Sequence, residues 1–111
     1  MEQNSMTEPL RSVVISTYDH VKYIEQCINS ALMQRTDLPF EILIGEDEST
    51  DGTREVCKRI ADARPDRIRL FLRSREDVIY IQGKPTGRYN LLNSLNAAKG
   101  KYIALCDGDD Y

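Results

Sequence analysis

Two aspartates near the end of the chain have a spacing that suits a hard metal ion. Asp107 and Asp109 are separated by a single glycine, so their carboxylates could direct oxygen atoms towards one point. Mg²⁺ and Mn²⁺ prefer oxygen ligands and usually take few of them from protein, the rest coming from water and phosphate. An ion held there could bridge a diphosphate and neutralise its charge as it departs. The alternative is a solvated acidic turn, because a D-x-D sequence by itself is common.

A second acidic segment, Glu46 to Gly52, offers a carboxylate for a different task. Asp47 directly follows an apolar run, where a carboxylate in an α/β fold can accept hydrogen bonds from a base N–H or from ribose hydroxyls. Asp51 is better explained as a cap of the following helix. Tyr18 offers a ring on which a nucleobase could stack, with packing over the next helix as the alternative. His20, the single histidine, is interpreted as a surface or capping residue.

The elements that must position these residues alternate along the chain. Short apolar runs predict strands, at residues 12–16, 40–45, 67–72 and 102–106. Amphipathic stretches predict helices, at residues 20–34, from 53 to the proline at 65, and 90–99. Residues 74–87 are less regular, with a short strand or a docked loop at 78–81. The pattern predicts a Rossmann-like, doubly wound α/β fold whose mostly parallel sheet has about four strands, with three helices.

In such a sheet the carboxyl ends of the strands share one edge, where ligands bind. We therefore expect both acidic segments to lie at the same edge of the sheet. In the last predicted helix, the apolar face is expected to consist of Leu91, Leu92, Leu95 and Ala98. Gly100 is expected to end this helix as its C′ glycine.

Composition narrows the functional classes. The 111 residues suffice for one domain, and 41% hydrophobic with 30% charged residues is typical of a globular protein. The net charge of −3 gives no basic face for nucleic acid. No apolar stretch approaches the ~20 residues of a membrane span, and we expect no secretion because the first residues do not resemble a charged-then-apolar leader. The absence of G-x-G-x-x-G and P-loop sequences counts against dinucleotide dehydrogenases and ordinary NTPases.

Cys27, Cys57 and Cys106 are scattered and odd in number, so we interpret them as core residues of a reduced protein. The expected location is the cytoplasm, and peripheral attachment of the full-length protein to the inner face of the membrane stays open. Residues 1–10 are expected to form a flexible tail, ahead of a binding subdomain over 11–111.

Four segments together carry a resemblance that none of them carries alone. They are V-V-I-S-T-Y-D from Val13, E-D-E-S-T-D-G-T from Glu46, A-A-K-G-K-Y-I from Ala97 and C-D-G-D-D-Y from Cys106. In order and spacing they resemble the inverting family 2 glycosyltransferases of the GT-A fold, from about residue 12 to residue 111. The resemblance implies metal-assisted departure of a nucleoside diphosphate as an acceptor hydroxyl attacks the anomeric carbon.

The resemblance also implies roles for individual residues. Ser16 and Tyr18, with Thr17 between them, would border the base of a nucleotide-diphosphate sugar, and Asp47 would bind its uracil-like edge. Asp107 would lie against the ribose and diphosphate and share a Mn²⁺ or Mg²⁺ ion with Asp109. Two departures concern the site: Glu46 and Glu48 replace an aspartate and a glycine. The usual A-R-N is replaced by Asn90-Leu91-Leu92, which leaves Arg88 as the candidate substitute for the arginine.

We therefore expect the chain to bind donor and metal while ending before the acceptor half and its general base. No catalytic residue is expected within it, and the acceptor, a glycan or a lipid-linked saccharide, is not identified. The alternatives are a non-catalytic nucleotide-sugar-binding module and a nucleotidyltransferase, which would want a basic, glycine-rich segment after the first strand. Self-association of the chain is expected from an uncovered last strand.

Overall fold

The computed structural model describes residues 11–33 and 39–108. Over these residues a parallel sheet has the strand order β3-β2-β1-β6, so the last strand pairs with the first. Its strands are β1 (Arg11–Thr17), β2 (Phe40–Glu46), β3 (Ile68–Leu72) and β6 (Tyr102–Asp107). The sequence-based prediction of an α/β fold with four strands is confirmed, with boundaries within one residue of those expected.

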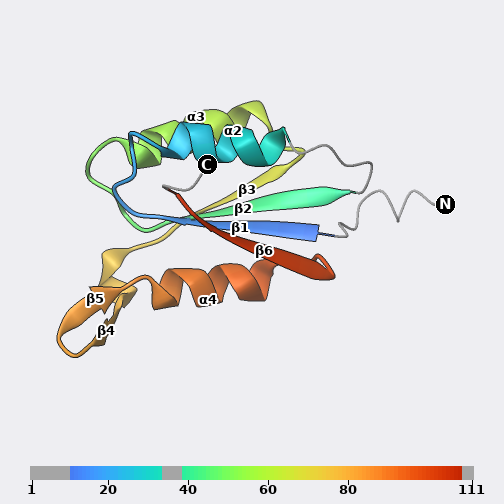
Figure 1. Ribbon diagram of the computed structural model, residues 1–111. Coiled ribbons are helices and arrows are strands. Elements are labelled where there is room, and N and C mark those ends of the chain that lie inside the picture. Colours follow the sequence, from blue (N-terminus) through green and yellow to red (C-terminus); the bar gives the residue numbers. More distant parts are fainter. Residues whose placement is uncertain (1–10, 34–38, 109–111) are drawn as a thin grey trace.

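Helices cover both faces of this sheet (Figure 1). Two of them, α2 (Ile24–Leu32) and α3 (Thr53–Ala63), lie on one face, and α4 (Arg88–Ala97) lies on the other. The apolar core fills the space between the sheet and the first two helices, because alternate side chains of each strand point to that face. Its buried members are Val13, Ile15, Ile24, Cys27, Ile28, Ala31, Ile42, Ile44, Cys57, Ile60 and Ile68.

The face covered by α4 is partly polar, and the expected leucine face of this helix is found only in part, because Leu91 and Leu95 are half-buried. Asn90 and Ser94 are the buried residues of α4, whereas Leu92 is 48% exposed. Asn90 donates from Nδ2 to the carbonyl of Gly45 at 2.8 Å, and both buried residues accept from Arg73 at 3.1 and 3.2 Å. The physical reason is Gly45, whose missing side chain lets the polar side of α4 approach the backbone of β2. An added Cβ there would meet the Asn90 amide oxygen.

A buried carboxylate fixes the segment between α4 and β6 at the other end of the sheet. Glu41 accepts from the Ser12 hydroxyl at 2.7 Å, the Lys99 backbone N–H at 2.7 Å and Arg69 at 3.0 Å. Burial alone would raise the pKa of Glu41, but these hydrogen bonds outweigh it and hold the pKa below its usual value. Gly100 is not a left-handed helix cap as expected. It is needed because a Cβ there would lie 2.6 Å from the Ser12 nitrogen.

The irregular segment contains a hairpin. After a 3₁₀ turn at Arg75–Asp77, β4 (Ile79–Ile81) pairs antiparallel with β5 (Lys84–Thr86). Gln82 and Gly83 both have positive φ, as a two-residue hairpin turn requires. Of the two alternatives left open at 78–81, a short strand or a docked loop, the structure has the strand at Ile79–Ile81, and its partner β5 was not anticipated. The hairpin projects beyond the sheet beside the start of α4 (Figure 1).

The expected flexible tail at residues 1–10 lies outside the described residues, so its structure stays a prediction. Within the described part of the chain, no helix combines the length and the apolar character needed to cross a membrane.

Candidate functional site

The segments that follow β1, β2 and β6 meet at the carboxyl edge of the sheet. The Asp47 N–H donates to the Thr17 carbonyl at 3.0 Å, and the Gly108 N–H donates to the Ser16 carbonyl at 2.9 Å. Gly108 is buried, and a Cβ there would lie 2.5 Å from the Thr17 hydroxyl, so this approach requires glycine. The two acidic segments are thus anchored to adjacent residues of β1, Thr17 and Ser16, as parallel topology predicts.

Asp47, Tyr18 and Arg75 form a compact group at this edge. The Asp47 carboxylate is 4% exposed and accepts from an Arg75 guanidinium nitrogen at 2.8 Å. The central carbon of the Arg75 guanidinium lies 4.0 Å from the centroid of the Tyr18 ring, in a cation–π contact. Burial raises the pKa of Asp47, and the charge and hydrogen bond of Arg75 oppose that rise. A partly desolvated carboxylate therefore lies beside an aromatic residue, Tyr18, that is 40% exposed.

Glu46, at the end of β2, and Glu48, in the loop that follows, both hold this loop in place. Glu46 is fully buried, and its carboxylate accepts from the Arg54 side chain at 2.6 Å and from the Ser49 N–H at 2.9 Å. Glu48 adopts φ 57°, a conformation that L-residues disfavour and glycine adopts freely. Its carboxylate accepts from the Arg75 N–H at 2.7 Å. Glu46 and Glu48, which depart from the family pattern, are therefore compatible with the conformation of the loop backbone and add hydrogen bonds to it.

The residues expected to be structural at this edge have structural partners. Asp51 accepts from the Thr53 N–H at 3.0 Å and from the Val21 N–H at 3.1 Å, so it caps the start of α3. His20 shares a hydrogen bond of 2.9 Å with the Thr17 hydroxyl. Because side chains alternate along a strand, Thr17 points to the opposite face from Ser16. Its side chain is thus not brought together with the other candidate binding residues.

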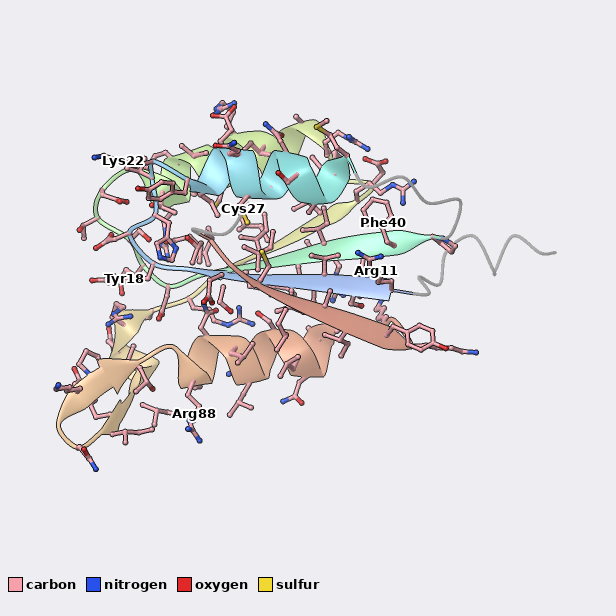
Figure 2. All side chains as sticks on the ribbon, viewed as in Figure 1. Arg11, Tyr18, Lys22, Cys27, Phe40 and Arg88 are labelled. Atoms are coloured by element: carbon pink, nitrogen blue, oxygen red, sulfur yellow. The ribbon has the colours of Figure 1, made fainter. Side chains whose placement is uncertain are left out.

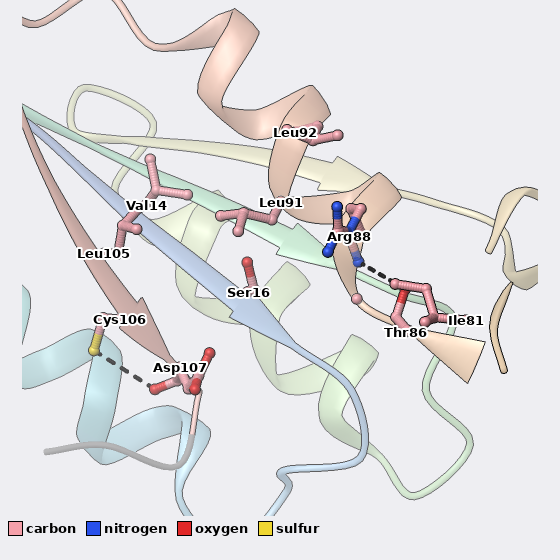
Figure 3. Close-up of a pocket in the computed structure, with 11 residues that line it drawn as sticks. Val14, Ser16, Ile81, Thr86, Arg88, Leu91, Leu92, Leu105, Cys106 and Asp107 are labelled. Atoms are coloured by element: carbon pink, nitrogen blue, oxygen red, sulfur yellow. Dashed lines mark hydrogen bonds between the residues drawn. The ribbon is translucent and has the colours of Figure 1, made fainter. Parts of the chain in front are cut away.

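A cavity of about 640 Å³ opens between the sheet, α4 and the hairpin (Figure 3). Leu91, Leu105 and other apolar side chains form much of its wall, and Ser16, Arg88 and Asp107 supply polar groups. The Ser16 hydroxyl oxygen is buried and has no hydrogen-bond partner among the described residues. Such a group favours a polar ligand or water in the cavity. The structure thus brings Ser16, Arg88 and Asp107 to one cavity, beside the group formed by Tyr18 and Asp47.

The end of β6 offers oxygen donors, the ligand type that hard divalent ions prefer. Asp107 is exposed, and its carboxylate lines the cavity, which provides one hard oxygen donor. Asp109, the other expected ligand, lies outside the described residues. Among residues 11–33 and 39–108, no cluster of three or more His, Cys, Asp or Glu could hold a metal ion. Asp107 is thus the one expected metal ligand that the described residues include, and Mg²⁺ and Mn²⁺ usually take few ligands from protein.

Sequence reasoning missed Arg75 and the polar partners of α4. Arg75 lies in a segment without strand or helix periodicity, so no pattern placed it beside Tyr18 and Asp47. Asn90 and Ser94 are four residues apart, a spacing that puts them on one face of a helix and was the available signal. The leucines between them dominated the prediction instead.

Comparisons with known proteins agree with this geometry. The sequence profile of glycosyl transferase family 2 matches residues 12–111. An uncharacterised protein of Mycobacterium bovis is 34% identical over 100 residues, which cover 90% of this chain and 27% of that protein. The chondroitin synthase of Pasteurella multocida is 37% identical over 107 residues, 93% of this chain and 10% of the synthase.

A solved structure shares the fold. The mannosyltransferase PcManGT from Pyrobaculum calidifontis, in complex with GDP-Man and Mn²⁺, superposes with a TM-score of 0.69 at 26% identity. The match covers 92% of this chain and 28% of that protein. The chain thus spans about a quarter of the length of the uncharacterised Mycobacterium relative. With the family profile matched from residue 12 to residue 111 and the GT-A architecture in place, the chain belongs to glycosyltransferase family 2.

Proposed function

We propose that this chain is the donor-binding part of an inverting glycosyltransferase that uses a nucleoside diphosphate sugar and Mn²⁺ or Mg²⁺. The proposal rests on two features at one edge of the sheet. Tyr18 and Asp47 form a group that could bind a base, and Ser16, Arg88 and Asp107 supply the polar groups of the cavity. The match to a mannosyltransferase in complex with GDP-Man and Mn²⁺ supports the same ligand class.

The residues divide the donor between them. The base stacks on the Tyr18 ring in the place that the Arg75 guanidinium takes in the free protein, a contact worth ~1–3 kcal/mol. Asp47 accepts a hydrogen bond from an N–H of the base. The diphosphate lies along the end of β6, where the Ser16 hydroxyl and the Arg88 guanidinium supply donors.

Asp107 and Asp109 would hold the ion, which supplies charge neutralisation as the nucleoside diphosphate departs. The acceptor hydroxyl then attacks the anomeric carbon from the opposite side, which inverts its configuration. We assign no described residue as the base that deprotonates this hydroxyl. The acceptor class, a glycan or a lipid-linked saccharide, remains a prediction, as does peripheral membrane attachment.

Calorimetry with uridine and guanosine diphosphates tests the proposal. We expect binding in Mn²⁺ or Mg²⁺ and little binding in chelator, because the carboxylates at 107 and 109 repel a diphosphate without an intervening cation. Asp107→Asn and Asp109→Ala should reduce the affinity in Mn²⁺ to that seen in chelator. Asp66→Asn, an exposed carboxylate before β3 at the other end of the sheet, should leave it unchanged. Equal affinity with and without the ion would contradict the metal role.

A further inference from the structure

Two thiols meet between α2 and the end of β6, beside the candidate metal ligand Asp107. The Sγ atoms of Cys27 and Cys106 are 3.6 Å apart, and the two cysteines are not joined by a disulfide in the structure. Cys27 lies on the side of α2 that faces the sheet (Figure 2). Each Sγ atom is also 3.5 Å from the Asp107 carbonyl oxygen, and Figure 3 shows this contact for Cys106. The contact joins residues 79 positions apart, which the scattered cysteine spacing could not indicate.

We propose that Cys27 and Cys106 are a site of reversible disulfide formation, and that the disulfide lowers the affinity for the donor. The second half of this inference rests on the proposed function, and the first half does not. A disulfide needs sulfurs about 2.05 Å apart, so the two must approach by roughly 1.5 Å. β6 is an edge strand of the described sheet, with β1 as its single neighbour, and can make that shift more readily than a central strand.

Hydrogen peroxide is an oxidant that balances the reaction. Cys106 is half-buried whereas Cys27 is 2% exposed, so peroxide reaches Cys106 first. The Cys106 sulfur attacks one peroxide oxygen and loses its proton, and the O–O bond breaks. The products are a sulfenic acid at Cys106 and one water. The Cys27 sulfur then attacks the Cys106 sulfur, loses its proton and expels the hydroxyl as a second water. Two thiols lose two electrons in total, and one peroxide is reduced to two waters. A small dithiol reverses the step by thiol–disulfide exchange.

The disulfide acts on the donor site through Asp107. Cys106 immediately precedes Asp107, so a shift of the Cys106 sulfur towards α2 moves the backbone that carries this carboxylate. Oxidation also removes the S–H groups that lie against the Asp107 carbonyl. A charge-assisted contact to the donor or its ion would then be lost, and we expect roughly tenfold weaker nucleotide binding.

Cys57 provides an internal control. It lies on α3, fully buried, and burial raises the pKa of its thiol to about 12. A buried thiol that stays protonated is a poor nucleophile, so Cys57 should not react. The chain thus contains one candidate pair and one unreactive cysteine.

The test treats the reduced chain with a small excess of hydrogen peroxide and measures intact mass, disulfide-linked peptides and nucleoside diphosphate affinity in Mn²⁺. We expect a monomer lighter by two hydrogen atoms, a peptide linking residues 27 and 106, and roughly tenfold weaker binding that dithiothreitol restores. Cys57→Ser should behave like the parent. Cys106→Ser, which alters the less buried partner, should lose both the mass change and the effect on binding.

Addition of oxygen to Cys106 without a linked peptide would overturn the disulfide. A linked peptide with unchanged affinity would overturn its control of the donor site. If the reduced chain bound no nucleoside diphosphate under any condition, the proposed function and the control claim would both fail. The mass and peptide measurements would still decide whether the disulfide forms.

Discussion

At the scale of single residues, Asp47 combines burial with a cationic partner that a ligand can replace. Its carboxylate is nearly inaccessible and is paired with Arg75, which also covers the Tyr18 ring. An incoming base would exchange these two contacts for stacking and a hydrogen bond of its own. We therefore predict that Asp47 influences how tightly different bases bind.

Asp47→Ala should weaken nucleoside diphosphate binding by about tenfold to a hundredfold, the usual effect of losing a hydrogen bond to a charged group. The loss should differ between uridine and guanosine diphosphates, because their base edges present different donors. Glu48→Gln, one residue away, should bind like the parent, since the amide oxygen can still accept from the Arg75 N–H. If Asp47→Ala bound both nucleotides as the parent does, the residue would be structural only.

The raised pKa of Asp47 predicts a pH dependence of binding. Asp47 must be ionised to accept a charge-assisted hydrogen bond, so affinity should fall as the pH falls through its raised pKa. This loss should begin at a higher pH than for an exposed aspartate, whose pKa is about 3.9.

The raised pKa of Asp47 affects stability in the opposite direction from binding as the pH changes. The folded state holds the Asp47 proton more tightly than the unfolded chain does, so ionisation of this group opposes folding. Its contribution to the free energy of unfolding should therefore rise as the pH falls through the raised pKa. Titration of nucleotide affinity and of denaturation midpoints, for the parent and Asp47→Asn, would check both signs. An unchanged profile in Asp47→Asn would assign the dependence to another group.

At the scale of elements, the docking of α4 depends on what β2 lacks at residue 45. Gly45 brings the backbone of β2 against Asn90 and Ser94, and Arg73 completes the hydrogen bonds. The helix also forms one wall of the cavity and carries Arg88 at its start. Displacement of α4 would therefore disturb this cavity as well as the fold.

Gly45→Ala should lower the free energy of unfolding by about 1–3 kcal/mol, because the new methyl group overlaps the Asn90 amide oxygen. Chemical denaturation followed by circular dichroism measures the change. Gly87→Ser is the control, since a Cβ at Gly87 meets nothing within 4 Å and serine suits the first position before a helix. Comparable losses in both variants would mean that close packing at Gly45 does not hold α4.

At the scale of the whole molecule, the strand β6 leaves large apolar side chains exposed. Tyr102, Ile103 and Leu105 are 66%, 46% and 60% exposed on a strand with one neighbour in the described sheet. Apolar edge strands tend to pair with other chains, and symmetric dimers are the commonest result. We expect the chain to self-associate through this strand.

Size-exclusion chromatography with light scattering checks that expectation. Ile103→Lys should shift the chain towards a monomer, because a charge on the edge strand opposes strand pairing. Leu72→Lys, at an exposed position of β3 on the opposite edge, should leave the association unchanged. A parent chain that is monomeric at all concentrations would contradict the prediction.

The sequence by itself determined the fold class, the order of strands and helices along the chain, and the family. Hydrophobic periodicity is a local property, so the runs around residues 13, 42 and 103 revealed their strands directly. Parallel topology then placed Asp47 and Asp107 at one edge. Their binding roles, and those of Ser16, Tyr18, Arg88 and Asp109, remain predictions.

Only the tertiary structure decided which side chains meet. Arg75 reaches Tyr18 and Asp47 from a segment without periodicity, and Cys27 of α2 meets Cys106 of β6 on the face of the sheet that α2 covers. The polar face of α4 is buried because Gly45, far away in sequence, removes the side chain that would have excluded it. Contacts of this kind depend on how two elements pack, and a pattern read along one element carries no information about its partner.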